Sequence, residues 1–258
     1  MVIALLTDFG SKDYFVGAMK GAILSINQNA KIVDLTHEIS PQDITGANFT
    51  LRACYKNFPQ KTIFAVVVDP GVGSPRKAIL VQTENYYFIA PDNGLLSFVF
   101  DDEAKDFKVY ELVNEKFFAD KVSRTFHGRD VFAPVAAHLS NGVQPKEFGA
   151  EIKDYIRLKT SVPRVISEGE IEAEIIHADR FGNLITNLKQ SDLPENFTLG
   201  IGGRTINRLQ TFFGEAEKDE LFMIMGSAGF LEIAAFQDSA ANLLKAQVGQ
   251  KVTILQNN

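Results

Sequence analysis

The sequence predicts an α/β protein in two parts, an N-terminal α/β domain with a central, mostly parallel sheet and a smaller C-terminal domain of antiparallel strands. In the first half, strand-like and helix-like segments alternate, which is typical of a parallel sheet covered on both faces. After about residue 154, Glu170, Glu172 and Glu174 alternate with apolar residues, as in a strand with one face in water. The 258 residues are 45% hydrophobic and 22% charged, so the chain can bury substantial cores.

The first half supplies the elements of the α/β domain in order. Residues 2–6 form an apolar run typical of a strand, and apolar residues recur at helical spacing over 15–26. A second expected strand at 31–35 is followed by a helix with Ser40 as its N-cap and Pro41 in its first turn. The later expected elements are a fully buried strand, the two strands of a hairpin and two helices, at 62–68, 78–83 with 86–90, 92–100 and 130–139.

Short strands separated by glycine turns fill the second half of the chain. They are expected at 170–175, 200–203, 221–225, 229–235 and 251–255. This pattern favours a small antiparallel barrel or sandwich. The segment 156–167, which contains Pro163, is the expected connection, and we place the two domains at residues 1–158 and 165–258.

The overall charge and the cysteine content argue against several classes of protein. A net charge of −6 is unlike that of a general nucleic-acid binder, which usually presents a basic face. The single cysteine, Cys54, cannot form an internal disulfide, which favours a reducing compartment. No apolar stretch is long enough to span a bilayer, and the first residues predict a strand rather than a signal peptide. We therefore expect a cytoplasmic protein that binds neither membranes nor nucleic acids.

Polar residues gather directly after the predicted strands and before one predicted helix. In an open α/β sheet, ligands bind outside the carboxyl ends of the strands, so these clusters are candidate sites. Asp8 and Asp69 each follow an apolar run, where an unpaired carboxylate is costly unless it meets a cation, donors or a ligand. The four clusters are Thr7-Asp8-Phe9-Gly10-Ser11-Lys12-Asp13, Val68-Asp69-Pro70-Gly71-Val72-Gly73-Ser74-Pro75-Arg76, Pro91-Asp92-Asn93-Gly94 and Thr125-Phe126-His127-Gly128-Arg129-Asp130.

Familiar cofactor and metal motifs are missing from the sequence. It has no P-loop and no His-Glu-x-x-His zinc motif, and Gly71-Val72-Gly73 lacks the third glycine of a dinucleotide fingerprint. The histidines, at 37, 127, 138 and 177, are scattered along the chain. We therefore expect no metal site and no bound cofactor.

Six short stretches, taken in order, resemble one enzyme family: the adenosine-forming S-adenosyl-L-methionine (SAM) hydrolases, also called SAM hydroxide adenosyltransferases. These are the water-using relatives of the fluorinase and chlorinase enzymes. The stretches span both predicted domains, and their shared order makes the resemblance specific. They are Thr7-Asp8-Phe9-Gly10, Asp69-Pro70-Gly71-Val72-Gly73, Ala90-Pro91-Asp92-Asn93-Gly94, Thr125-Phe126-His127-Gly128-Arg129-Asp130, Asp179-Arg180-Phe181-Gly182-Asn183 and Gly226-Ser227-Ala228-Gly229-Phe230.

The resemblance implies a C-terminal β-barrel domain and a homotrimer that binds its substrate between neighbouring subunits. It also implies a triad of Asp69, Arg76 and His127 around the attacking water, with Asp8 accepting hydrogen bonds from the ribose hydroxyls. The other expected substrate contacts are Phe181 and Asn183 at the adenine, Phe9 and Phe126 as pocket aromatics, and Asp13, Asp179, Ser227 and Glu232 at or near the methionine end.

Two positions bear on the choice between hydrolysis and halogenation. The resemblance implies that the halogenases carry tyrosine at the position of Asp69 and replace His127. A carboxylate in a dry pocket would repel a halide, whereas a carboxylate or an imidazole can accept a proton from water. The sequence therefore predicts hydrolysis of SAM to adenosine and L-methionine, with water attacking the 5′ carbon in line with the departing sulfur.

The proton acceptor and three alternative functions stay open at this point. Arg76 would weaken Asp69 as a base, so either the imidazole takes the proton or Arg76 stabilises a hydroxide-like nucleophile. One alternative is a SAM-dependent halogenase, disfavoured by Asp69 and His127. A second is a metal-dependent phosphohydrolase that would add Asp8 and Asp92 to those residues. A third is a non-catalytic protein that binds SAM or adenosine.

Overall fold

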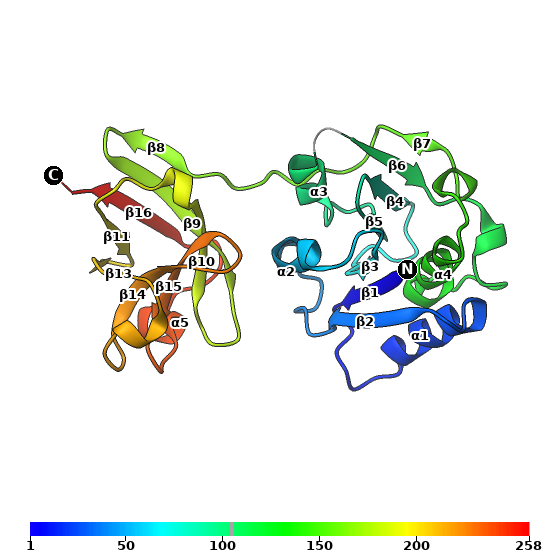
Figure 1. Ribbon diagram of the computed structural model, residues 1–258, viewed down its shortest axis with the longest axis horizontal. Coiled ribbons are helices and arrows are strands. Elements are labelled where there is room, and N and C mark those ends of the chain that lie inside the picture. The colour runs from blue at the N-terminus through cyan, green and yellow to red at the C-terminus, as the bar shows by residue number, and fades with distance from the viewer. Residues whose placement is uncertain (104–105, 258) are drawn as a thin grey trace. The chain divides into compact units, whose positions relative to one another are not determined.

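The computed structural model describes residues 1–103 and 106–257; residue 258, the last of the predicted C-terminal domain, lies outside them. The chain forms two compact units, Met1–Lys159 and Thr160–Asn258. Each unit contains its own sheet (Figure 1). Within the described part of the chain, no helix is both long and apolar enough to cross a membrane.

The sheet of the first unit is mixed, with a parallel half and an antiparallel half. Its strand order is β2-β1-β3-β5-β4-β6-β7. The parallel neighbours are β2 (Lys31–Thr36), β1 (Val2–Thr7), β3 (Ile63–Val67) and β5 (Tyr87–Pro91). The antiparallel strands are β4 (Ala78–Thr83), β6 (Phe107–Glu111) and β7 (Glu151–Ile152). The parallel pairing expected of a mostly parallel sheet is thus present in one half of this sheet, and β4 with β5 forms the predicted hairpin.

Helices cover both faces of this sheet, as the alternating sequence pattern predicts. Successive residues of β1 point to opposite faces, so Ile3 packs in one core cluster and Ala4 in the other. Met19 joins the first cluster and Leu51 the second. The helices are α1 (Phe15–Ile26), α2 (Ile44–Cys54), α3 (Ser97–Asp102) and α4 (Ala133–Ser140), with a π-helical turn at Gly128–Phe132 and 3₁₀ turns at Tyr55–Asn57, Glu115–Phe117 and Pro145–Glu147.

The predicted start of the second helix is wrong. Ser40 is not its N-cap; α2 begins at Ile44, and the Asp43 side chain accepts a hydrogen bond from the Gly46 N–H at 2.8 Å. The physical reason is the backbone of Gln42, whose φ of 67° cannot belong to a right-handed helix. The chain therefore becomes helical only after Gln42.

The second unit contains a mostly antiparallel sheet and one short helix. Its strand path runs β12-β11-β16-β9-β10-β15-β14-β13, with β8 paired to β9. This open path does not confirm the closed barrel, although Ala173 and Ile175 are buried on β9 as the alternation of that strand predicts. The elements are β8 (Arg164–Ser167), β9 (Glu170–Ala178), β10 (Leu184–Lys189), β11 (Phe197–Ile201), β12 (Arg204–Ile206), β13 (Leu209–Gln210), β14 (Leu221–Met225), β15 (Phe230–Ala235), β16 (Lys251–Gln256), α5 (Ala240–Leu244) and the 3₁₀ turns Gln190–Asp192 and Phe213–Glu215.

The register of the first sheet brings two of the candidate clusters to one edge. Strands β1 and β3 are parallel neighbours, with Thr7 opposite Val67. Asp8 and Asp69 therefore leave the same edge of the sheet, one after each strand. This edge holds the pocket described next.

Candidate active site

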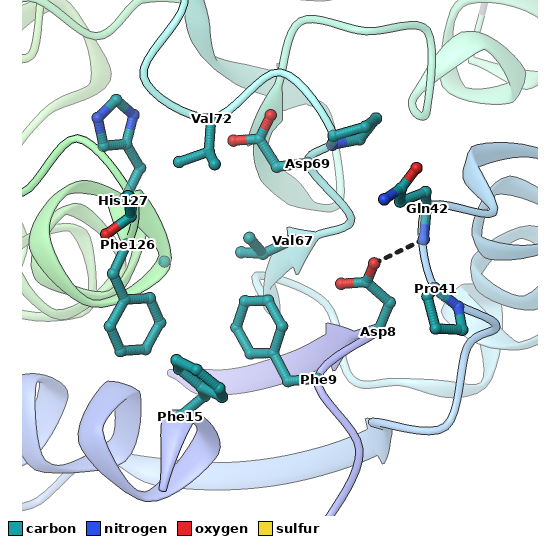
Figure 2. A pocket seen from close by; sticks show the side chains of 13 residues that line it. Asp8, Phe9, Phe15, Pro41, Gln42, Val67, Asp69, Val72, Phe126 and His127 are labelled. Atoms are coloured by element: carbon teal, nitrogen blue, oxygen red, sulfur yellow. Dashed lines mark hydrogen bonds between the residues drawn. The ribbon is translucent and has the colours of Figure 1, made fainter. Parts of the chain in front are cut away.

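A cavity of about 430 Å³ lies at the carboxyl edge of β1 and β3, in the first unit. Figure 2 shows the Asp8 and Asp69 carboxylates on one side of it and His127 on the other. Of the predicted site residues, Asp8, Phe9, Asp69, Phe126 and His127 line this cavity. The tertiary structure therefore brings together three of the four clusters that the sequence placed at strand and helix ends.

Asp69, Arg76 and His127 form one hydrogen-bonded network. The guanidinium of Arg76 binds the carboxylate through both oxygens: Nε donates to Oδ1 at 2.9 Å, and Nη2 donates to Oδ2. The same Nη2 lies 2.9 Å from Nδ1 of His127. The Asp69 and Arg76 side chains are only 5% and 11% exposed, so this ion pair is largely shielded from water. The side chains of the predicted triad therefore meet although two of them lie 51 residues apart.

The hydrogen bonds of His127 define which ring nitrogen carries its proton. An arginine side chain only donates, so Nδ1 accepts from Arg76 and the proton of the neutral ring sits on Nε2. Burial and the nearby charge of Arg76 lower the pKa of His127, against the opposing effects of Asp69, Asp130 and a hydrogen bond to the Ser123 backbone. His127 is therefore neutral at pH 7.

A close approach and a hydrogen bond position the loops that carry this network. Gly73 has φ of 77° and lies against the backbone carbonyl of Arg124, where a Cβ atom would clash. The loop before His127 is also tied to the π-helical turn, because the buried Asp130 accepts from the Ser123 N–H at 2.8 Å. Gly73 thus allows the loop after β3 to touch the loop that carries the imidazole.

Asp8 is held differently from Asp69. Its Oδ2 accepts a hydrogen bond from the backbone N–H of Gln42 at 2.8 Å, and Figure 2 shows the other oxygen turned toward the middle of the pocket. Gln42 itself lines the cavity. Its left-handed backbone is uncommon for a residue with a side chain.

Aromatic rings form the apolar wall of the pocket. The ring of Phe126 lies 5.8 Å from that of Phe9 and 5.1 Å from that of Phe15, centroid to centroid, both edge to face. Figure 2 shows the three rings together at one end of the cavity. Such a wall suits a flat apolar group, and the ring faces can attract a cation.

The prediction missed several pocket residues. Phe15 appeared only as part of a helical pattern, and Gln42 only as part of a helix start. Thr125 and Val72 also line the pocket; they lie in two of the polar clusters, but the sequence indicates no contact with substrate for either. The four-residue segment Ser40-Pro41-Gln42-Asp43, which follows the second strand, was the available signal, because it too lies after a strand end.

Other predicted residues lie outside this cavity. Asp13 is exposed in the loop before α1 and does not line it. In the second unit, Asp179 binds a tight turn: Oδ1 accepts from the N–H groups of Phe181 and Asn183, at 2.9 and 2.8 Å, and Oδ2 accepts from the Asn183 side-chain amide at 2.9 Å. The Phe181 side chain on this turn is 78% exposed. The structure thus brings Asp179, Phe181 and Asn183 together.

Glu232 and Ser227 lie on neighbouring parts of the second unit. Burial, with a smaller contribution from the Asp179 charge, raises the pKa of Glu232, which lies on β15. Its carboxyl group lies against Gly226, where any Cβ atom would overlap it. Ser227 follows in the same turn and is exposed. The second unit therefore presents a half-buried carboxyl group, an exposed hydroxyl and an exposed aromatic ring.

Asp92 does not belong to the pocket. It is 5% exposed, and its Oδ1 accepts a hydrogen bond from the Ile156 N–H at 2.8 Å, in the segment that leads out of the first unit. Among residues 1–103 and 106–257, no three His, Cys, Asp or Glu side chains are arranged to hold a metal ion. Of the four residues that the metal-dependent phosphohydrolase alternative requires, Asp92 thus lies apart from the cavity that Asp8, Asp69 and His127 line.

Comparison with known proteins decides the family. The models of the SAM hydroxide adenosyltransferase N-terminal and C-terminal domains match residues 3–149 and 173–253. The chain belongs to the SAM hydroxide adenosyltransferase family. The family predicted from the six stretches is thus confirmed, and the chain is an enzyme of the hydrolase type.

Individual relatives match nearly the whole of this chain. The (R)-S-adenosyl-L-methionine hydrolase of Methanocaldococcus jannaschii is 35% identical over 98% of this chain and 95% of its own. A crystal structure of an uncharacterized conserved protein from Thermotoga maritima superposes with a TM-score of 0.92 at 37% identity, covering 99% of this chain and all of that one. A fluorinase from an Actinoplanes species is more distant, 27% identical over 98% of this chain and 97% of its own.

Proposed function

We propose that this chain hydrolyses (R)-S-adenosyl-L-methionine to adenosine and L-methionine. The observation that carries the proposal is the Asp69–Arg76–His127 network, which shares one cavity with the Asp8 carboxylate. The (R) configuration at sulfur is the one specified in the name of the M. jannaschii relative. Water supplies the oxygen that joins the 5′ carbon; the C–S bond breaks and its electron pair returns to sulfur, which leaves as a neutral thioether.

Asp8 supports the proposal as the ribose-binding group. A carboxylate can accept a hydrogen bond from each of two neighbouring hydroxyls. The Gln42 N–H fixes Oδ2, and the other oxygen is turned toward the pocket. The aromatic wall of Phe9, Phe15 and Phe126 on the same cavity offers ring faces to the sulfonium cation, which only the reactant carries.

The hydrogen bonds of the network favour one division of roles within it. Nδ1 of His127 already accepts from Arg76, and the other ring nitrogen carries a proton, so the neutral imidazole has no free lone pair for a proton from water. Asp69 is acceptor-only and lines the cavity, so it orients the attacking water and receives its proton as the C–O bond forms. A sulfonium is a strong leaving group, so alignment of water with the 5′ carbon supplies much of the rate enhancement.

The second unit is proposed to bind the remaining parts of the substrate. The Asn183 amide nitrogen donates to Asp179, which leaves its oxygen to accept a hydrogen bond from the adenine amino group. The exposed Phe181 ring stacks on the adenine, and Glu232 and Ser227 bind the methionine end. Asp13 and Asp179 remain proposed contributors near that end. In the proposed homotrimer, these groups come from the subunit next to the one that supplies the pocket.

The route of the oxygen atom tests the proposed reaction. The enzyme is incubated with (R)- and (S)-SAM separately in ¹⁸O-labelled water, and the products are measured by mass spectrometry. We expect labelled adenosine and free methionine, with faster turnover of the (R) form. Unlabelled adenosine would contradict direct attack by water, and tight binding without product would support the non-catalytic alternative. A 5′-halogenated product in the presence of chloride or fluoride would support a halogenase.

The assembly, the cofactor requirement and the cellular location are separate proposals. Sedimentation should give three times the 28.5 kDa mass of one chain, and a monomer with full activity would contradict the shared site. Dialysis against a chelator should leave the rate unchanged, since no cofactor is proposed. The cytoplasmic location stays a prediction from the single Cys54.

A further inference from the structure

A second array of buried polar side chains lies outside the pocket and contacts residues 8–10, which we call the Asp8 loop. It joins Thr7, the last residue of β1, to His37, which follows β2. The Thr7 hydroxyl oxygen lies 2.9 Å from Nδ1 of His37. Thr7 is fully buried and His37 is 9% exposed, so neither side chain can exchange its partner for bulk water. Burying a polar group costs free energy unless it forms a hydrogen bond. Here Thr7 and His37 bond to each other and to backbone amides of the Asp8 loop.

The charges around the array assign its hydrogen atoms. Nε2 of His37 lies 3.1 Å from Oδ1 of Asp34, an electrostatic contact rather than a well-aligned hydrogen bond. Burial raises the pKa of Asp34, but the hydrogen bond from Lys20 and the attraction of Lys20 and His37 outweigh it and keep that pKa below its usual value. The ionised carboxylate attracts an N–H, so Nε2 carries the ring proton. Nδ1 is then the acceptor, and the Thr7 hydroxyl donates to it.

Both ends of the array hold the main chain next to Asp8. With its hydrogen given to His37, the Thr7 oxygen accepts from the backbone N–H of Phe9 at 3.2 Å. The backbone carbonyl of His37 accepts from the N–H of Gly10 at 2.7 Å. Gly10 has φ of 66°, the left-handed backbone that a glycine adopts without strain. The two amides that follow Asp8 are therefore both anchored by this array.

We propose that His37 and Thr7 are positioning residues that hold the Asp8 loop in the geometry required for ribose binding. This inference rests on the proposed function, because Asp8 is the ribose-binding group there. The array touches none of the reacting atoms, so its loss should weaken binding of the nucleoside and leave the chemical step nearly unchanged. The Gln42 N–H holds the Asp8 carboxylate, and Thr7 and His37 hold the two backbone amides that follow Asp8.

Matched substitutions separate the hydrogen bond from simple packing. Thr7→Val removes the hydroxyl with little change of shape, and Thr7→Ser keeps it. His37→Asn retains an oxygen that can occupy the position of Nδ1 and accept from Thr7, whereas His37→Gln extends past that position. His138→Gln is the control, because His138 packs against Phe117 in the same unit and does not line the pocket. The double variant Thr7→Val/His37→Gln tests whether the two residues act as one unit.

Three readouts are measured on the full chain: kcat and KM with SAM, the adenosine Kd by titration calorimetry, and hydrogen exchange of the Phe9 amide. For Thr7→Val and His37→Gln we expect faster exchange at Phe9, adenosine Kd and KM raised about tenfold, and kcat within about twofold; tenfold corresponds to about 1.4 kcal/mol. Thr7→Ser, His37→Asn and His138→Gln should retain wild-type binding. The adenosine Kd of the double variant should be no higher than that of the single variant with the higher Kd.

The outcomes distinguish this inference from the proposed function. Unchanged exchange at Phe9 in Thr7→Val would overturn the inference whatever the activity. Equal loss in His37→Asn and His37→Gln would also overturn it, because the effect would then follow the ring rather than its hydrogen bond. If the wild type forms no adenosine from SAM, the proposed function fails and the substrate part of the inference fails with it. The exchange data would still decide whether the array anchors the loop.

Discussion

Two carboxylates leave the same edge of the first sheet, and their surroundings give them different tasks. Asp69 is bound through both oxygens by Arg76, which also contacts His127. Asp8 has one oxygen on the Gln42 N–H and the other turned toward the pocket. An arginine fork fixes the orientation of a carboxylate, whereas a single backbone donor leaves it able to accept from a ligand. On this difference rests our proposal that Asp69 serves turnover and Asp8 serves binding.

The sharpest test of this difference is Asp69→Asn. The amide keeps the volume of the side chain but loses the charge that orients water and receives its proton. We expect kcat to fall by about 10² to 10⁴-fold, the usual range for loss of a catalytic acid or base, with adenosine affinity changed less than about threefold. Single-turnover kinetics and calorimetry give the two numbers. Equal losses of kcat and affinity would show that Asp69 also binds substrate.

Asp8→Asn should show the opposite pattern. The amide oxygen can still accept from the Gln42 N–H, but the charge-assisted bonds to the ribose are lost. Since such bonds contribute about 1.5–3 kcal/mol, adenosine should bind about 10 to 150-fold more weakly. The bound substrate should react at a rate within a few-fold of wild type. Asp101→Asn, at a carboxylate on α3 outside the pocket, is the control, and it should change neither quantity.

Gly73→Ala tests how the Asp69 side of the pocket is assembled. The new methyl group would clash with the Arg124 carbonyl and would also strain a φ of 77°, so the two loops must separate. We expect a loss of about 1–3 kcal/mol in unfolding free energy and about a tenfold lower kcat, with adenosine affinity nearly retained. Gly142→Ala is the matched control, because Gly142 has φ of 94° with no atom near its Cβ position. It should lose stability but keep kcat.

The smallest expected effect is on the pH profile. Burial, followed by the charge of Arg76, lowers the pKa of His127 below its usual 6.5, so the neutral form that accepts from Arg76 persists at neutral pH. The kcat should therefore stay flat from about pH 8 down to 6.5 and decline only below that, as protonation displaces Arg76. In His127→Asn, an acceptor that does not titrate in this range, the acid decline should move lower or vanish. A decline centred above pH 6.5 would contradict this assignment.

The prediction from sequence succeeded where a local pattern corresponds to a backbone structure. The helical spacing of 15–26 is α1, and the apolar run of 62–68 contains the fully buried β3. The sequence pattern does not predict strand β6 (Phe107–Glu111). Its two buried residues, Val109 and Tyr110, are adjacent, so the strand lacks the alternation of buried and exposed residues that would reveal it. Ser40 was wrongly assigned as a cap because nothing local indicates that Gln42 adopts a left-handed backbone.

Local sequence patterns specify the alternation of strands and helices, the antiparallel character of the second half and the placement of Asp8 and Asp69 after apolar runs. These features depend on residue periodicity and backbone hydrogen bonding, which act over a few residues. The residue patterns alone do not show that Arg76 contacts both Asp69 and His127, that Gln42 holds Asp8, or that Thr7 meets His37; the folded structure does. Contacts between loops distant in sequence depend on how the helices and strands pack, and no local pattern specifies that.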